Sequence, residues 1–258
     1  MIYSMKPLFT IAAISDIHVD KYNLRKEFFE SINGVADLLL IGGDMNNGKD
    51  EDVKNFLELV SGVHIPMVII FGNHDCDTGN TKKIRDMLLS NSFVRVLDGE
   101  YVEYTINGKT VGIAGAKGYG GGFAPHRIVR RGEDATKAFV DEEDREVMKL
   151  ESALQQMETA APDFKIALTH WAAFTETIEG EPKELYVVLG SSRLGDVITK
   201  TSVHLALSGH AHHGSKGIKK AHSIISVCNI GYRVNDETMP LFDFFSNESV
   251  SLRYRESH

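Results

Sequence analysis

The sequence predicts an α/β protein in which two mixed β-sheets follow one another along the chain, with helices on the outside. Over the first 90 residues, apolar runs of strand length alternate with helical patterns, which is typical of βαβ units and a largely parallel sheet. Beyond residue 90 short strands follow one another directly, and the end of the chain is again rich in them. No repeat, low-complexity tract or linker divides the sequence, so we expect residues 1–258 to form one domain.

Three strand–helix pairs are expected in the N-terminal part. The expected strands cover 8–15, 37–42 and 66–71, and the expected helices cover about 23–32, 50–61 and 81–90. Each strand is recognised by a continuous apolar run such as ADLLLIG, which is the pattern of a strand buried on both faces.

After residue 90 the expected elements are mostly strands. They cover 93–97, 101–106, 110–115, 164–169, 203–208, 223–229, 240–245 and 249–254. Asn107-Gly108, between the second and third of these strands, is a strong hairpin signal. A long charged amphipathic helix is expected over 136–160, closed by Pro162, and a shorter helix near 191–201. Two segments show no regular pattern, 116–135 and 171–190.

Five of the apolar runs end in a short polar cluster. The clusters are Asp16-Ile17-His18, Gly43-Asp44, Gly72-Asn73-His74-Asp75, Thr169-His170 and Gly209-His210-Ala211-His212. Because parallel strands deliver their C-terminal ends to one edge of a sheet, these side chains can converge there. Asp, His and Asn are hard-to-borderline ligands that bind transition metals. The sequence therefore predicts a metal-dependent hydrolase with two metal ions.

Taken singly, each cluster has an ordinary alternative. Asp16 and His18 are two residues apart and can bind the same ion, but either could instead cap a helix or stand in a polar loop. Asp44 follows two glycines and could bridge two cations or cap its own turn. Asn73 could be a turn residue, and His170 a core histidine. The prediction depends on the five clusters occurring together and in order.

This ordered pattern closely resembles the calcineurin-like metallophosphoesterases, whose signature runs D-x-H, G-D, G-N-H-D/E, H and G-H-x-H. All five blocks are intact between residues 16 and 212. The resemblance implies a four-layer α/β/β/α sandwich and a dinuclear metal centre. The implied ligands are Asp16, His18, Asp44 and His212 for one ion, and Asp44, Asn73, His170 and His210 for the other. Asp44 would then bridge the two ions.

Such a pair of divalent ions binds a bridging hydroxide, which attacks phosphorus. In the family, the residue matching His74 faces the phosphoryl group and protonates the leaving group or stabilises charge. We expect Asp75 to orient the His74 imidazole, although Asp75 could equally be a helix-start or loop carboxylate. With no thiolate among the implied ligands, Mn²⁺, Fe, Zn²⁺ or Co²⁺ would suit the site, and we favour manganese or an iron-containing pair.

Substrate selection is expected from the irregular segment 116–135. Gly120 permits close backbone approach, Tyr119 or Phe123 could stack on a base or aromatic leaving group, and Arg127 belongs to a basic cluster that could grip a second phosphate. The alternative is a solvated loop whose arginines pair with Glu133, Asp134 or the acidic run 141–144. This stretch is similar to that of small prokaryotic phosphoesterases related to the cyclic-nucleotide phosphodiesterase branch.

The composition of the chain limits the kinds of partner that it can bind. A formal net charge of -8 argues against a general nucleic-acid or membrane-surface binder. No run reaches the length of a membrane helix, and the apolar run after Lys6-Pro7 is interpreted as a strand and not as a signal sequence. The two cysteines, Cys76 and Cys228, favour a reducing compartment, so we expect a cytoplasmic protein. Nothing in the pattern demands an oligomer.

The expected activity is hydrolysis of a small phosphodiester or phosphomonoester, with a nucleotide as one candidate. One alternative is a protein-binding scaffold that keeps this fold without catalysis, but such proteins lack some ligands or the histidine of G-N-H-D, and here His74 is present. Another alternative is a single-metal hydrolase of the amide or lactam type, which typically carries H-x-H-x-D-H, a pattern that this sequence lacks.

Overall fold

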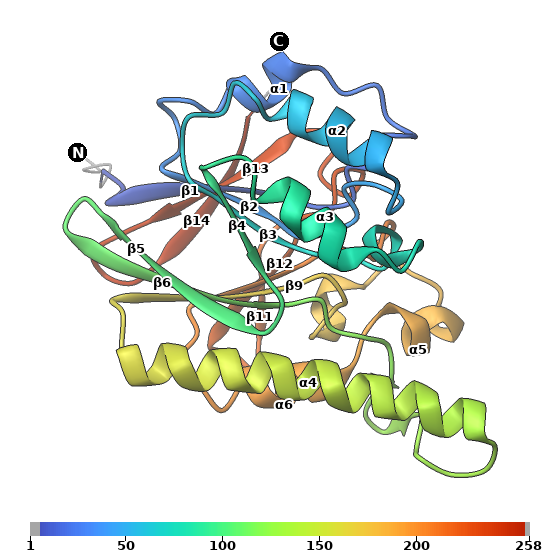
Figure 1. Ribbon diagram of the computed structural model, residues 1–258. Helices are drawn as coiled ribbons and strands as arrows, with labels where there is room; N and C mark the ends of the chain where they lie inside the picture. Colours follow the sequence, from blue (N-terminus) through green and yellow to red (C-terminus); the bar gives the residue numbers. More distant parts are fainter. Residues whose placement is uncertain (1–5, 256–258) are drawn as a thin grey trace.

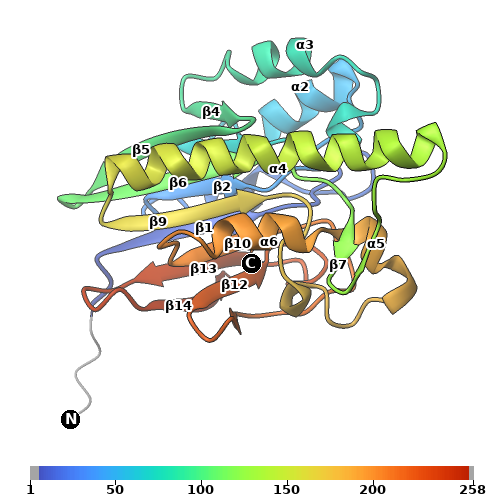
Figure 2. The ribbon, with the colours of Figure 1, turned by 90° about the horizontal axis from the view of Figure 1, so that it is seen from below.

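Two six-stranded β-sheets lie face to face in the computed structural model, which describes residues 6–255, and helices cover the outer face of each sheet (Figure 1). The four layers are therefore helix, sheet, sheet, helix, as the sequence and its family resemblance predict. Figure 2, seen from below, shows the longest of the described helices crossing in front of the sheets. None of the helices in residues 6–255 combines the length and apolar composition that crossing a bilayer requires.

The first sheet has the strand order β14-β13-β1-β2-β3-β4. Its strands are β1 (Phe9–Ile14), β2 (Leu38–Ile41), β3 (Met67–Ile70), β4 (Val94–Leu97), β13 (Met239–Phe244) and β14 (Val250–Arg255). β1 to β4 are parallel, whereas β13 pairs antiparallel with β1, with Phe9 opposite Phe244. The expectation of two sheets in succession along the chain is thus corrected, because the C-terminal hairpin returns to the first sheet.

The second sheet has the order β11-β12-β10-β9-β6-β5. Its strands are β5 (Glu100–Ile106), β6 (Lys109–Ala116), β9 (Phe164–Thr169), β10 (Leu205–Ser208), β11 (Lys219–Ala221) and β12 (Ile225–Asn229). β6, β9, β10 and β12 run parallel, so four more strand ends point to one edge. The β5–β6 hairpin turns at Asn107 (φ 50°) and Gly108 (φ 78°), the left-handed conformations that a two-residue hairpin turn needs.

Helices occupy the two outer layers. α1 (Lys26–Glu30), α2 (Asp50–Leu59) and α3 (Thr81–Leu88) cover the first sheet, and α4 (Asp134–Ala160) and α6 (Ser192–Ile198) cover the second (Figure 1). α4 ends where Ala161 adopts a left-handed conformation ahead of Pro162, which cannot continue a helix. The segment expected to be irregular over 171–190 contains short helices, among them α5 (Tyr186–Leu189).

Apolar side chains fill the three spaces between the four layers. Leu39 and Ile41 of β2 face the helices of the first layer, whereas Leu38 and Leu40 face the second sheet, and all four are fully buried. This explains the continuous apolar runs, since both faces of each central strand are covered. Burying one such side chain contributes about 1.5–3 kcal/mol, so the strands and hence their C-terminal ends are firmly held.

Candidate metal centre

Loops that follow five parallel strands bring the polar clusters together at one edge of the two sheets. Two groups form, and within each group the potential ligand atoms lie within 4.8 Å of one another. They are Asp16, His18 and His212 in the first group, and Asp44, His170 and His210 in the second. The Asn73 amide oxygen lies 3.1 Å from His170 Nε2, which places it beside the second group. All seven residues implied by the sequence pattern therefore meet.

Asp44 lies between the two groups. Its Oδ2 is 3.4 Å from His170 Nε2 in one group and 3.8 Å from His18 Nε2 in the other. Its Oδ1 accepts the backbone N–H of His74 at 2.9 Å. Asp44 is thus positioned to offer one carboxylate oxygen to two neighbouring cations.

Several polar atoms of this centre are buried and have no hydrogen-bond partner. Within residues 6–255, Asp44 Oδ2 and both ring nitrogens of His18 have no hydrogen-bond partner. A buried polar atom without a partner costs about 1–3 kcal/mol, and a charged one more. A cation beside these atoms would satisfy Asp44 Oδ2 and one ring nitrogen of His18, so the residues present fit a metal site.

The backbone at the ligand positions is strained. Asp16, His18, Asp44 and His210 have left-handed φ values of 57°, 41°, 52° and 66°. Outside glycine this conformation costs about 1–2 kcal/mol per residue, and such residues concentrate at functional sites. The strain lets the chain turn sharply at the end of each strand and direct these side chains inward.

Three glycines permit the loops to approach closely enough. A Cβ on Gly43 would lie 2.4 Å from the Gly72 nitrogen, and one on Gly72 would lie 2.1 Å from Asp44 Oδ1. A Cβ on Gly209 would lie 2.5 Å from Asp16 Oδ2. Glycine is required because a side chain at Gly72 or Gly209 would displace a carboxylate of the centre, and one at Gly43 would push the two loops apart.

The charge states of the centre follow from burial and from the two carboxylates. Although burial raises the pKa of Asp16, its hydrogen bond with His212 and the charge of His170 hold that pKa well below the usual range. Burial lowers the pKa of His18 to about 4, and burial together with His170 lowers that of His210 to about 4. The carboxylate of Asp16 is therefore ionised and these two imidazoles are neutral, which are the forms that bind metals.

A comparison with known families decides the relationship. A family model described as calcineurin-like phosphoesterase matches residues 9–214. The chain belongs to the calcineurin-like phosphoesterases. This family uses divalent metals, and the two groups of side chains are candidate ligand sets. A comparison with curated proteins gave no significant match.

Solved structures share the fold of this calcineurin-like phosphoesterase. The TT1561 protein of Thermus thermophilus is 18% identical with a TM-score of 0.63, over 95% of this chain and 98% of that chain. A Staphylococcus aureus protein provisionally named a 5'-nucleotidase, solved with α-ketoglutarate, is 13% identical with a TM-score of 0.56, over 95% of this chain and 52% of that one. At these identities the likeness establishes the fold alone.

His74 and Asp75 do not interact as expected from the sequence. The His74 ring is half-exposed, its centroid lies 5.2 Å from that of His18, and its Nδ1 is 3.0 Å from Asp77 Oδ2. His74–Cys76 form a single 3₁₀ turn, in which residues three apart share a face, so the partner is Asp77. The spacing His-x-x-Asp could have indicated this pair.

Asp75 instead holds the neighbouring loop. Its fully buried carboxylate accepts four backbone N–H groups, those of Asp44 (2.8 Å), Met45 (3.1 Å), Asn46 (3.1 Å) and Gly72 (2.8 Å). The Asp75 side chain therefore fixes the position of the Asp44 loop against β3, and through it the carboxylate between the two ligand groups. The assignment of Asp75 as the residue that orients His74 is corrected accordingly.

The first part of the predicted substrate segment, residues 116–123, packs against the rest of the protein, whereas most of the residues after it are exposed. The Tyr119 ring lies 5.3 Å from that of Trp171, and Phe123 is buried in a small apolar cluster. A Cβ on Gly120 would lie 2.8 Å from the Val187 carbonyl oxygen. Arg127 faces Asp196 at 3.7 Å. Tyr119, Gly120 and Phe123 therefore pack against other parts of the fold, whereas Arg127 is exposed and its role in substrate binding stays a prediction.

The alternative of paired arginines agrees better with this segment. Arg130 Nε donates to Asp141 Oδ1 at 2.6 Å, and Asp141 belongs to the acidic run 141–144 that the sequence offers as a partner. The pair is exposed, so it contributes little to stability. Because Arg130 is paired with Asp141, its charge is not free to bind a second phosphate of the substrate.

A sixth strand end, which the sequence analysis missed, also reaches this edge. β12 is parallel to its neighbour β10, and after it the Tyr232 N–H donates to the Ser15 carbonyl at 2.9 Å. The Tyr22 ring lies 6.2 Å from His18 and 5.3 Å from Tyr232, and the Arg233 guanidinium carbon lies 5.9 Å from the Tyr22 ring. The sequence signal for this strand end is the apolar run before Gly231-Tyr232-Arg233, since this run is followed by a short cluster as the other five are.

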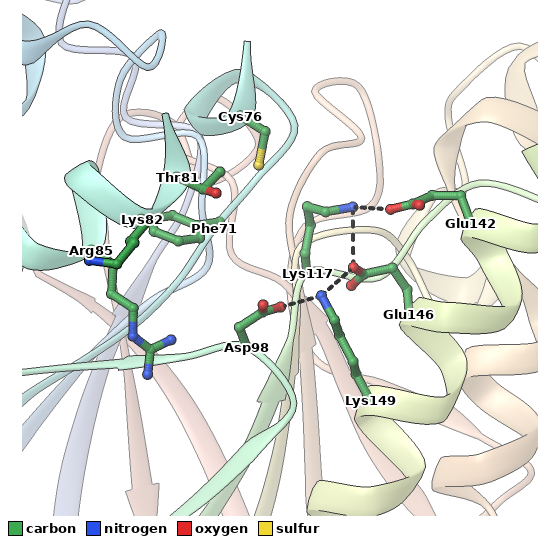
Figure 3. A pocket seen from close by; sticks show the side chains of 10 residues that line it. All are labelled: Phe71, Cys76, Thr81, Lys82, Arg85, Asp98, Lys117, Glu142, Glu146 and Lys149. Carbon is green, nitrogen blue, oxygen red and sulfur yellow. Dashed lines mark hydrogen bonds and ion pairs between the residues drawn. The ribbon is translucent and has the colours of Figure 1, made fainter. Parts of the chain in front are cut away.

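A pocket of about 340 Å³ lies between α3 and α4, beside the loop that carries His74 (Figure 3). Its four cationic side chains each face a carboxylate. The pairs are Lys82 with Asp86, Arg85 with Glu100, Lys117 with Glu142 and Glu146, and Lys149 with Asp98 and Glu146. Glu146 also accepts the Gly118 N–H at 3.0 Å, so this ionic network ties α4 to the loop after β6.

Proposed function

We propose that this chain is a dinuclear metal-dependent phosphoesterase that hydrolyses a small phosphomonoester or phosphodiester. The position of Asp44 carries the proposal, because its unpaired Oδ2 faces a histidine of each ligand group. A single-metal hydrolase would need only one such group, and the H-x-H-x-D-H pattern of that class is absent from the sequence.

The ligands are assigned by their grouping. Asp16, His18 and His212 would hold one ion, and His170, His210 and Asn73 the other, with Asp44 shared. Two divalent ions there would supply positive charge for the phosphate oxygens and activate water for attack on phosphorus. Asp16 and Asp44 are the only carboxylates in this set, so about two net positive charges would remain to attract the anion.

His74 is the candidate for protonating the leaving oxygen or stabilising its charge. The ring stands beside His18 and is exposed enough to meet a substrate. Asp77 accepts from Nδ1, which leaves Nε2 to face the reacting group. Asp77 would thus act as the positioning residue, while Asp75 keeps the Asp44 loop in place.

The chemistry of the ligands supports manganese or an iron-containing pair. Imidazole, carboxylate and amide oxygen ligands suit Mn²⁺, Fe, Zn²⁺ and Co²⁺. The Cys76 thiol lies 3.4 Å from the Gly72 carbonyl, and burial raises its pKa to about 12, as it does for Cys228. Neither thiol is therefore suited to serve as a thiolate ligand.

The residues beside the metal centre on the side of His18 favour a small anionic substrate. Arg233 and Tyr22 lie on the side of His18, where the guanidinium pairs with the exposed Glu237 at 2.7 Å and could exchange that partner for a second anionic group of the substrate. The likeness to the Staphylococcus aureus protein provisionally named a 5'-nucleotidase makes a nucleotide a reasonable candidate. The acidic chain favours such a molecule over long nucleic acid.

Three broader assignments complete the proposal. We assign the described residues to one domain, since the C-terminal hairpin is part of the first sheet. Both cysteines are free, which supports a reducing compartment and hence the cytoplasm. The partner is taken to be the phosphate ester itself, without a general nucleic-acid or membrane role.

The test is turnover with added metal. Purified protein with Mn²⁺ should hydrolyse a nitrophenyl phosphate or its bis-ester, and a screen across nucleotides, cyclic nucleotides and sugar phosphates should then identify the preferred class. Asp44→Asn and His74→Ala should each abolish most of this turnover while leaving the protein folded. If the folded wild-type protein turns over no phosphate ester with any of the four metals, the catalytically silent scaffold is the better description.

A further inference from the structure

His210 is held from two sides by groups that no motif in the sequence marks. Its Nε2 lies 3.0 Å from the carbonyl oxygen of Val188, just after the middle of α5. The indole of Trp171 lies on its ring, with centroids 4.0 Å apart and planes inclined by 36°. Both contacts act on a proposed ligand of the second ion.

The first contact decides which nitrogen is available. A carbonyl oxygen only accepts hydrogen bonds, so Nε2 must carry the hydrogen of the neutral imidazole. Nδ1 is then the nitrogen with a free lone pair. His170 is arranged in the opposite sense, since its Nδ1 is 2.8 Å from the Gly42 carbonyl and its Nε2 faces Asp44. The two histidines of this group thus offer different nitrogens.

The Val188 carbonyl is placed by hydrogen bonds on both sides of its segment. On one side, Gly121 N–H donates to the Val187 carbonyl at 3.0 Å and Gly122 N–H to the Gly190 carbonyl at 2.9 Å. On the other side, Ala172 N–H donates to the Leu189 carbonyl at 3.1 Å. Residues 187–190 are therefore fixed between the glycine-rich loop 118–122 and the chain just after His170.

Glycines make this arrangement possible. A Cβ on Gly190 would lie 2.0 Å from the Ala172 carbonyl oxygen, and one on Gly120 would lie 2.8 Å from the Val187 carbonyl oxygen. The loop itself is anchored to α4, because Glu146 accepts the Gly118 N–H. The run of glycines is explained by close backbone packing.

Trp171 links the two histidines. The His170 and Trp171 N–H groups both donate to the Lys117 carbonyl, at 3.0 and 3.1 Å. The indole is almost fully buried, and its second face meets the loop through Tyr119. Trp171 therefore follows His170 in the chain, and its indole covers the ring of His210.

We propose that Trp171 and the Val188 carbonyl are positioning groups that fix the tautomer and orientation of His210, so that the second ion is bound through Nδ1. The glycine-rich loop 118–122 serves as the support that keeps the Val188 carbonyl in place. This inference rests on the dinuclear site of the proposed function, and it assigns to the loop a role in metal binding in place of substrate choice.

The test is metal affinity measured separately at the two sites. Metal-free protein is titrated with Mn²⁺ by calorimetry, and with Co²⁺ while the visible spectrum of the bound ion is recorded. Trp171→Leu, which keeps an apolar side chain in the buried space, should weaken one of two binding steps by about 10–100-fold and change the Co²⁺ spectrum of that step. Gly190→Ala should weaken the same step, since its methyl group would displace the segment from Ala172.

The matched control is the variant Trp171→Phe. Within the described part of the chain, Trp171 Nε1 has no hydrogen-bond partner, so Trp171→Phe loses no hydrogen bond while it keeps an aromatic face on His210. Its affinity should stay within about threefold of wild type, because the smaller phenyl ring leaves a cavity but still lies on His210. His18→Ala should weaken the other binding step.

The outcomes separate the two proposals. If wild-type protein binds two ions and Trp171→Leu and Gly190→Ala, checked as folded by circular dichroism, retain both affinities, the inference about His210 is overturned and the dinuclear site stands. The inference also fails if Trp171→Phe loses as much affinity as Trp171→Leu, or if both steps weaken equally. Wild-type protein that binds only one ion would overturn both the dinuclear site and this inference.

Discussion

Substitution of Gly72 by alanine is the sharpest test of the geometry around Asp44. The added Cβ would lie 2.1 Å from Asp44 Oδ1 and 2.5 Å from the Asp44 nitrogen, whereas ordinary contacts begin near 3.4 Å. The carboxylate or the loop must therefore move by about 1 Å. Such a shift would lengthen the hydrogen bond from His74 N–H to Asp44 Oδ1 and displace Oδ2 from its place between the two ligand groups.

The magnitude follows from these contacts. A hydrogen bond to a charged group contributes about 1.5–3 kcal/mol, so the free energy of unfolding should fall by roughly that amount. A misplacement of about 1 Å in a catalytic centre can lower the rate about 100-fold, and we expect kcat/KM of Gly72→Ala to fall at least that far. Both metal-binding steps should weaken, because Asp44 is shared by the two ions.

The measurements are denaturation by urea, calorimetric titration with Mn²⁺ and phosphoesterase kinetics. Gly79→Ala is the matched control in the same loop, since a Cβ there would meet nothing within 4 Å and only its left-handed φ of 71° would be strained. It should lose about 1–2 kcal/mol of stability while keeping metal affinity and kcat/KM. If Gly72→Ala binds two ions and turns over substrate as well as Gly79→Ala does, the placement of Asp44 is wrong.

Two further predictions concern residues around the centre, and a third concerns Asp163, which lies at the other end of β9. His74→Ala should lower kcat by at least about 100-fold and Asp77→Asn by about 10-fold; an unchanged kcat for Asp77→Asn would contradict the pair. Arg233→Ala should raise KM about 10-fold for a substrate with a second anionic group, whereas Arg127→Ala should leave KM unchanged. The reverse result would make the segment 116–135 the substrate site. Hydrogen bonds from the start of β6 lower the pKa of Asp163 to about 2, so its stabilisation is present above about pH 4 and is lost as the pH falls through 2. Asp163→Asn should therefore be less stable than wild type at pH 6, with the difference in urea midpoint vanishing near pH 2, and a difference that is constant with pH would refute the assignment.

Local patterns in the sequence predicted most of the strands and the convergence of the ligand residues. The apolar run before Asp44, for example, indicates a strand buried on both faces, and a strand end at a sheet edge is where a ligand can be placed. Such reasoning uses only neighbours in sequence. It therefore succeeds wherever the position of a residue is set by the strand that it follows.

The missed features depend on contacts between distant segments or on the direction of a short turn. Nothing local in β13 indicates that it pairs with β1 and not with the second sheet. The 3₁₀ turn directs Asp75 toward the Asp44 loop and brings Asp77 to His74, and a pattern of residue types does not specify that rotation. Likewise, the glycines before Phe123 serve backbone packing against Val187, which becomes visible only when residues 187–190 are placed beside them.

The pairing of β13 with β1 has a consequence for the order in which the molecule can assemble. The Thr10 hydroxyl donates to Asp243 at 2.6 Å, across a sequence separation of 233 residues. β1, which carries Asp16 at its end, therefore keeps an open edge until nearly all of the described chain has been synthesised. Contacts of such long range slow folding, and an unpaired hydrophobic edge is prone to aggregation. A fragment that ended near residue 214, where the match to the family model stops, would retain all seven ligand residues and still lack the strand that closes its first sheet.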